Sequence, residues 1–328
     1  MSICCVGIMI KVAQIDPNGI CNSKCWFCPV AYEPNPLIAR KNMPIEDIEN
    51  ILKQLRDGIG DFVDPNYTVF WPSHFNEVLL YPMFEEMIAL YKKYNFPIIL
   101  FSNGVNLTKE KIDIINKYPK TIQGITLNIP SAFQKQWSVY TGFNEKIFNK
   151  LIDNLNYAYK NLNKEIHFGI QVNNFNENSL FENGGTVEIL SNAPILNLDN
   201  NSGDLIKTIE KFKSMYSDWA VFPDNANIDR VGYLKNAMIF SNERYLNKVS
   251  DNGKKRVVGC IEKRAEEFLH INANGDVFLC CCDYGFETVF GNIYKQSIKD
   301  IWYGIERKNM VEKSFSDFCT KCANAIWE

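Results

Sequence analysis

Short apolar runs alternate with longer amphipathic segments along the first two thirds of the chain. Runs with the length and residue types of buried strands stand at 8–15, 68–71, 98–101, 122–129, 165–172 and 219–222. Between them, apolar residues that recur every three or four positions predict helices over 45–55, 82–94, 109–117, 145–162 and 204–215. Strands that alternate with helices in this way predict right-handed βαβ units and an α/β fold with a parallel sheet.

The segment 173–203 interrupts this alternation. It is rich in Asn, Ser and Gly and follows the fifth predicted strand. Loops of this length are typically functional lids or disordered segments. Because the loops after the strands of a parallel barrel carry the active site, we expect a substrate lid here, with a tolerated insertion as the alternative.

The composition sets limits on the class of protein. The 328 residues are 46% hydrophobic and 22% charged, with a net charge of −3, which fits one large or two ordinary globular domains. The compact basic run 254–256 is too short to track a nucleic-acid backbone, so nucleic acid is not an expected partner. The apolar segment 1–15 contains Lys11 and lacks the features of a signal peptide, so we expect a buried strand. No apolar stretch is long enough to span a bilayer.

The cysteines are the most informative residue type. There are eleven, an odd number, and no export signal, which predicts a reducing compartment, the cytoplasm, where thiolates bind metal rather than pair. Cys21, Cys25 and Cys28 follow the first predicted strand with the spacing C-x3-C-x2-C. Three such thiolates can hold three irons of a four-iron, four-sulfur (4Fe–4S) cluster and leave one iron open. A zinc knuckle and a disulfide framework remain alternatives.

A second group of cysteines lies near the C-terminus. Asn274-Gly275 between alternating apolar runs predicts a hairpin, and cysteines stand before it, on it and after a following helix. The four predicted ligands are Cys260, Cys280, Cys319 and Cys322. They suffice for one closed 4Fe–4S cluster or for a zinc ribbon. Because alternate strand positions share a face, Cys282 can replace Cys280 as a ligand.

Together the two cysteine groups resemble the radical S-adenosylmethionine (SAM) superfamily with a C-terminal SPASM/Twitch extension. The first spacing resembles the superfamily signature, and Gly275-x4-Cys280 followed by C-x2-C resembles the shorter Twitch form. The resemblance implies a partial (β/α)6 TIM-like barrel at 1–240 and a small α+β auxiliary-cluster domain at 241–328. It also implies that SAM binds the open iron and is cleaved there to a 5′-deoxyadenosyl radical, which removes a hydrogen atom from the substrate.

The resemblance also assigns SAM contacts at the strand ends. Glu77 stands where the superfamily has a Gly-Gly-Glu-Pro-like turn, although both Gly and the Pro are replaced here, and it is expected to accept a hydrogen bond from the SAM ammonium. Asn103 in Ser-Asn-Gly matches the superfamily's Thr-Asn-Gly, with a left-handed turn residue as the alternative. The other candidates are Phe27 for adenine, Asn128, Gln171 and Asn173 for the ribose, and Arg230 for a carboxylate of SAM or substrate.

The resemblance leaves three functions open. We expect a radical SAM oxidoreductase, similar to radical dehydrogenases of small alcohols or amino sugars, with the auxiliary cluster as electron acceptor. The alternative is a peptide or protein maturase that forms thioether, carbon–carbon or epimerised products, although such enzymes often carry a peptide-recognition domain before the barrel and a second auxiliary cluster. An iron–sulfur electron carrier is the non-enzymatic alternative. The expected partners are a small-molecule or peptide substrate and an electron donor such as flavodoxin or ferredoxin.

Overall fold

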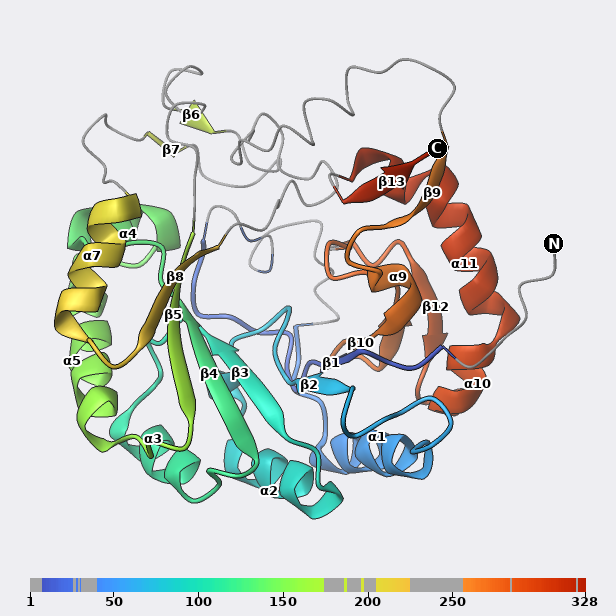
Figure 1. Ribbon diagram of the computed structural model, residues 1–328, viewed down its shortest axis with the longest axis horizontal. Helices are drawn as coiled ribbons and strands as arrows, with labels where there is room; N and C mark the ends of the chain where they lie inside the picture. The colour runs from blue at the N-terminus through green and yellow to red at the C-terminus, as the bar shows by residue number, and fades with distance from the viewer. Residues whose placement is uncertain are drawn as a thin grey trace.

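The computed structural model describes residues 8–25, 28, 30, 40–173, 186–187, 196–197, 205–224, 256–283, 285–322 and 324–328. A nine-stranded sheet in the order β12-β11-β10-β1-β2-β3-β4-β5-β8 runs through this part of the chain (Figure 1). Its barrel strands are β1 (Val12–Ile15), β2 (Val69–Trp71), β3 (Ile98–Ser102), β4 (Ile122–Asn128), β5 (His167–Asn173) and β8 (Ala220–Asp224). Each pairs with the next in parallel, so the predicted α/β class with a partial barrel is confirmed.

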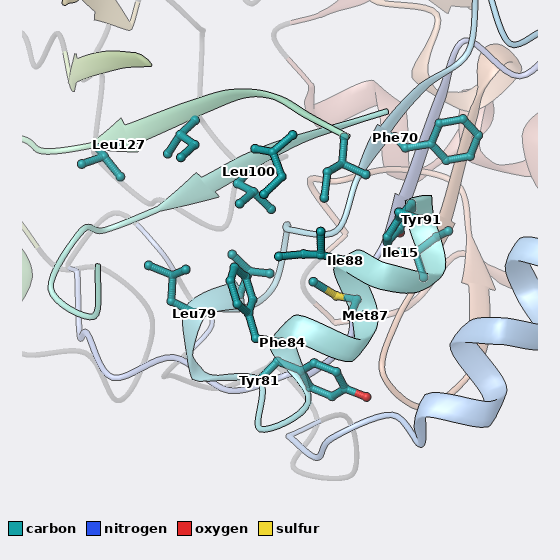
Figure 2. Close-up of a cluster of buried hydrophobic side chains, with 14 of the residues drawn as sticks. Ile15, Phe70, Leu79, Tyr81, Phe84, Met87, Ile88, Tyr91, Leu100 and Leu127 are labelled. Atoms are coloured by element: carbon teal, nitrogen blue, oxygen red, sulfur yellow. The ribbon is translucent and has the colours of Figure 1, made fainter. Parts of the chain in front are cut away.

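Helices cover the outer face of these strands (Figure 1). They are α1 (Ile45–Asp57), α2 (Phe84–Tyr94), α3 (Lys109–Asn116), α5 (Glu145–Asn161) and α7 (Leu205–Met215). Each turns an apolar stripe toward one continuous core. Figure 2 shows Phe84 and Ile88 of α2 beside Leu100 of β3 in that core. Among the described residues, no helix has the length and apolar character needed to cross a bilayer.

The predicted barrel elements agree with the observed ones apart from their ends and two omissions. The first strand covers only Val12–Ile15 of the predicted 8–15. Helix α4 (Gln134–Thr141) and the short helix η3 (Val78–Leu80) were not predicted. Asn144 and Thr108 cap α5 and α3 by accepting hydrogen bonds from backbone N–H groups of the first turn. Local sequence signals therefore account for most of the barrel elements.

The C-terminal region continues the barrel sheet. Strand β10 (Phe268–Ile271) pairs in parallel with β1, and β11 (Asp276–Phe278) and β12 (Val289–Asn292) follow in antiparallel order. The predicted hairpin is confirmed, and Gly275 has a φ of +80° in its turn. A Cβ on that glycine would meet the Tyr294 ring at 2.6 Å, so the turn requires glycine.

Other C-terminal elements pack beside this extension. They are β9 (Val257–Cys260), α9 (Arg264–Glu267), α10 (Ile298–Tyr303), α11 (Ile305–Ser316), η4 (Phe318–Lys321) and β13 (Ala325–Trp327), and β9 pairs with β13. The predicted domain boundary at 240/241 lies outside the described residues. Most of the predicted lid 173–203 also lies outside them. The described parts of it are Asn173, at the end of β5, and the paired strands β6 (Thr186–Val187) and β7 (Leu196–Asn197).

Candidate functional site

The loop after β1 carries Cys21, Cys25 and Cys28 at the carboxyl end of the parallel strands. Its turns are local: the Cys28 N–H donates to the Cys25 carbonyl at 3.0 Å, and the Ser23 N–H donates to Cys21 Sγ at 3.4 Å. The Ser23 hydroxyl lies 2.8 Å from Cys25 Sγ. We call residues 20–28 the cysteine loop. It presents its thiols where working residues of a parallel barrel are expected.

The electrostatics of this loop favour a bound cation. Burial raises the pKa of Cys25 to about 12, and the neighbouring Cys28 thiol adds to this effect. Burial also raises the pKa of Cys21 well above its usual range, and the charges of Glu77, Cys25 and Cys28 add in the same direction. Adjacent buried thiolates are unfavourable without a positive partner, and a coordinated metal supplies one. Cys21 and Cys25 are not joined in a disulfide. The donor set therefore fits an iron–sulfur cluster.

The end of helix α4 holds the cysteine loop in place. The Thr141 carbonyl accepts from the Ser23 hydroxyl and from the Lys24 N–H, both at 2.9 Å. Gly142 follows with a φ of +71°, and a Cβ there would lie 3.0 Å from the Lys24 Cβ. Sequence reasoning missed these contacts because it missed α4. The Gly after Thr141, a typical helix C-terminal signal, was the available clue.

Glu77 is a buried carboxylate that joins three loops. Its side chain lies in the interior with 1% exposure. Oε1 accepts from the Ser102 hydroxyl at 2.8 Å and the Leu79 N–H at 3.1 Å, while Oε2 accepts from the Asn103 N–H at 2.8 Å. Its own N–H donates to the Ile20 carbonyl at 2.8 Å. Burial raises the pKa of Glu77, and these hydrogen bonds oppose the rise.

Three of the four hydrogen-bond acceptor positions of the Glu77 carboxylate are therefore taken by the chain itself. The remaining position lies on Oε2. The contact with the SAM ammonium stays a prediction, and the structure adds a second role, in which Glu77 positions the cysteine loop.

Asn103 reaches the cysteine loop from the end of β3. Its Nδ2 donates to Asn22 Oδ1 at 2.9 Å and lies 3.9 Å from Cys21 Sγ, and its Oδ1 accepts from the Val105 N–H at 3.0 Å. The left-handed residue of this turn is Gly104, with a φ of +79°. The left-handed turn residue, the alternative role considered for Asn103, is therefore Gly104. The Asn103 side chain is directed toward Cys21.

The predicted ribose contacts gather at the carboxyl edge of β4 and β5. Asn128 and Gln171 are register partners on neighbouring strands, and both are half-buried. Asn173 lies two residues further along β5 and is buried, and its Oδ1 has no hydrogen-bond partner among the described residues. Their roles remain predictions. Phe27 and Arg230 lie outside the described residues.

The second cysteine group is assembled from three separate segments. Cys282 and Phe318 form a small buried cluster, and the half-buried thiols around it are Cys280, Cys281, Cys319 and Cys322. Burial raises the pKa of Cys319 to about 12, with further contributions from Cys260, Glu266 and Cys282. The predicted ligands thus lie together. Cys282 lies among them, so the choice between Cys280 and Cys282 stays open.

Arg264 is a functional candidate that sequence reasoning missed. Its Nη1 lies 3.6 Å from Cys282 Sγ. The charges of the Cys281, Cys282, Cys280 and Cys260 thiols raise its pKa well above the usual range, Cys281 most of all. A guanidinium among thiols stabilises their ionised form, which is the form that binds metal. Its place four residues after Cys260, before the hairpin, was the only sequence signal.

Comparison with known proteins agrees with this geometry. The model of the radical SAM superfamily matches residues 15–182, half of the chain, and an iron–sulfur cluster-binding SPASM domain matches residues 260–323. The protein belongs to the radical SAM superfamily, and it is an enzyme with a C-terminal SPASM domain rather than an electron carrier. These families imply 4Fe–4S clusters and SAM as cofactors, as the resemblance of the cysteine motifs to the superfamily implied. No curated protein matches the chain.

Solved structures of three proteins share the fold. BtrN in complex with AdoMet and 2-DOIA is 15% identical, with a TM-score of 0.55 over 97% of this chain and 93% of that chain. Streptococcus suis SuiB bound to precursor peptide SuiA is 16% identical, with a TM-score of 0.58 over 97% of this chain and 70% of that chain. Native anSMEcpe with bound AdoMet is 14% identical, with a TM-score of 0.58 over 96% and 88%. At these identities the likeness shows the fold alone.

Proposed function

We propose that this radical SAM enzyme oxidises a small alcohol or amino alcohol and uses the auxiliary cluster as the electron acceptor. When bound, SAM on the first cluster would supply a radical able to remove a hydrogen atom from the substrate carbon, and the auxiliary cluster would supply an acceptor for the second electron. Loss of the hydroxyl proton to solvent would complete the oxidation to a carbonyl. BtrN, crystallised with AdoMet and the small molecule 2-DOIA, shares the fold along almost its whole length, which supports this choice.

The observation that carries the proposal is the closeness of the two cysteine groups. Phe278 of β11 belongs to an apolar cluster with Phe75, against which Cys21 and Cys28 pack. Cys280 follows two residues after Phe278 and belongs to the second group. Strand β11 therefore connects the apolar cluster beside the first cysteines to the second group. A substrate held near this strand would lie close to both, as a second electron transfer requires.

The residues of the chain have positioning roles in this proposal. Glu77 and Asn103 hold the cysteine loop and offer polar atoms to SAM. Asn128, Gln171 and Asn173 line the edge of the sheet where the ribose is expected. Cys21, Cys25 and Cys28 would hold the first cluster, and Cys260, Cys319, Cys322 and either Cys280 or Cys282 the second.

Peptide modification is the second candidate. SuiB is bound to a precursor peptide in a structure with the same fold, and anSMEcpe has been crystallised with AdoMet and the Cp18Cys peptide. The same barrel therefore accepts peptides in those relatives. The two candidates differ in the origin of the hydrogen atom that the radical removes.

Isotope transfer tests the choice. The anaerobically reconstituted protein would be incubated with SAM, a reductant and carbon-deuterated polyols, amino sugars or serine-containing peptides, and 5′-deoxyadenosine would be analysed by mass spectrometry. We expect deuterium from a hydroxylated small molecule in 5′-deoxyadenosine, together with a carbonyl product that has lost that deuterium and the hydroxyl proton. Deuterium from peptides alone would replace this proposal with the second candidate.

A further inference from the structure

Three polar side chains form a row across β10, β1 and β2, which lie side by side (Figure 1). Gln14 of β1 is in register with His270 of β10 and with Trp71 of β2. Paired positions on neighbouring strands share a face of the sheet, so these three side chains point the same way. We call Gln14, Trp71 and His270 the polar row.

The polar row faces the inside of the partial barrel. The residues adjacent to it along the strands belong to the apolar core under the outer helices; they are Ala13, Ile15, Phe70, Leu269 and Ile271. Because successive residues of a strand point to opposite faces, the polar row points away from that core.

Four polar atoms of the row are buried and find no hydrogen-bond partner among the described residues. His270 is 0% exposed and Gln14 is 6% exposed. Gln14 Oε1, Trp71 Nε1 and both ring nitrogens of His270 have no hydrogen-bond partner within the described part of the chain. An unsatisfied buried polar group costs about 1–3 kcal/mol, and such groups are rare in native proteins. Several in one row point to a ligand that supplies their hydrogen bonds.

The row lies between the two cysteine groups. The His270 ring stacks on Phe278, with 5.4 Å between ring centroids, and Phe278 lies 5.7 Å from Phe75 beside the first cysteines. On its other side, His270 is close enough to Arg264 and Cys282 for their charges to act on it. Through His270 the polar row is therefore linked to the surroundings of both cysteine groups.

We propose that the polar row binds hydroxyl groups of a ring-shaped polyol or amino-polyol substrate. Gln14 Oε1 accepts, Trp71 Nε1 donates, and a neutral imidazole does both. Burial lowers the pKa of His270 well below its usual value, which keeps the ring neutral. A row without charge suits hydroxyl groups, since carboxylates and phosphates are bound by cations. This inference rests on the proposed oxidation and names its substrate class.

The surroundings of Trp71 fit a ring with one apolar face. Its indole packs edge-on against Phe101, with centroids 5.3 Å apart, and against Phe268 at 6.4 Å. Aromatic walls of this kind contact C–H groups, while the indole N–H contacts a hydroxyl. The row therefore offers both polar and apolar contacts to a sugar-like or cyclitol-like ring.

Binding to matched variants tests the inference. The holoprotein with SAM and without reductant would be titrated by anaerobic calorimetry with myo-inositol, an aminocyclitol, glucosamine and a serine tripeptide. We expect a hydroxyl-rich ring to bind, and Trp71→Phe and Gln14→Leu each to weaken binding about fivefold to tenfold, the worth of one hydrogen bond. Tyr91→Phe is the control, because it removes another buried hydroxyl without a partner, from α2. It should leave binding unchanged.

Two further results separate the possible outcomes. Gln14→Leu should leave the thermal stability of the ligand-free protein equal or higher, because it removes an unsatisfied buried atom; a clear loss of stability would assign the row a structural role. Binding of the tripeptide alone, equal binding by all variants, or failure of every hydroxyl-rich ring would overturn the inference. If deuterium still passes from another small molecule to 5′-deoxyadenosine, the proposed oxidation stands and only the polar row is wrong.

Discussion

The two cysteine groups are built in opposite ways. The cysteine loop is one short segment whose backbone and side chains are held by α4, by Glu77 and by Asn103. The second group draws its thiols from β9, from the residues after β11 and from the region of η4, and it includes more thiols than one cluster needs. A loop positioned by the protein keeps its shape without metal. The second group joins three segments from different elements, so a bound metal adds directly to the folding free energy of this region.

The largest effect is expected from removing the first group. Replacing Cys21, Cys25 and Cys28 together by Ala should abolish reductive SAM cleavage and lower the iron content from about eight to about four per chain, because the second group keeps its own thiolates. Anaerobic iron analysis and quantification of 5′-deoxyadenosine measure both. Continued 5′-deoxyadenosine formation would contradict the assignment, and so would zinc in place of iron.

Removing a ligand of the second group should cause a different loss of function. Cys319→Ala should still cleave SAM but yield little oxidised product, because the electron acceptor is missing, and it should lower the stability of the C-terminal region by several kcal/mol, since a metal ligand contributes to folding. Circular dichroism and residual iron separate the two effects. Cys281 lies outside the predicted ligand set, although its sulfur is within 4.8 Å of those of Cys280 and Cys282. Retention of both iron and product by Cys281→Ala would confirm that it is not a ligand. Full product formation by Cys319→Ala would exclude the electron-acceptor role.

Asp16 should make the region of the first group sensitive to pH. Burial raises the pKa of this carboxyl from 3.8 to about 8, although its Oδ2 accepts from the Phe75 N–H at 3.1 Å. The folded state holds the proton more tightly than the unfolded state, so stability is highest below the unfolded pKa and falls as pH rises toward 8. Between about pH 5 and about pH 8 the loss should be ~3 kcal/mol.

Asp16→Asn keeps an acceptor for Phe75 and removes the charge. Denaturant unfolding at several pH values should therefore show a flatter profile for the variant over this range, with its advantage greatest at high pH. Parallel profiles for the two proteins would mean that Asp16 ionises normally.

The smallest effect concerns the contact between the end of α4 and the cysteine loop. Gly142→Ala should cost about 1–2 kcal/mol for the left-handed backbone and should also press on Lys24. Gly60→Ala has a matching φ of +84°, and a Cβ added there would have nothing within 4 Å, so it reproduces the backbone cost alone. We expect only Gly142→Ala to lower SAM cleavage while the second group retains its iron. Equal activity of the two variants would show that α4 does not position the loop.

Much of the barrel could be predicted because each helix and strand shows the spacing of apolar residues typical of its type. The apolar stripe of α1, which buries Ile48, Ile51, Leu52 and Leu55, is an example. Helix α4 was not predicted because polar Gln136 and Thr141 stand among its buried residues and interrupt the apolar spacing. The pairing of β10 with β1 could not be predicted, because a strand pattern identifies a strand and not its partner.

Site features that depend on residue type and spacing could be predicted from the sequence. Features that depend on which side chains are buried together could not. The cysteine spacing identified both groups, and Ser-Asn-Gly pointed to Asn103. The internal hydrogen bonds of Glu77, the thiols around Arg264 and the polar row required coordinates, because each depends on side chains brought together from distant segments.

The parallel pairing of β1 with β10 has a consequence for biosynthesis. Val12 takes its place beside Phe268, which is synthesised 256 residues later. Until then one edge of β1 has no strand beside it in this sheet, and an open edge is a template for aggregation. We expect the nascent barrel to depend on chaperones or on slow elongation until β10 has been made, so that a ribosome-stalled chain ending before β10 should aggregate where a chain that includes β10 folds.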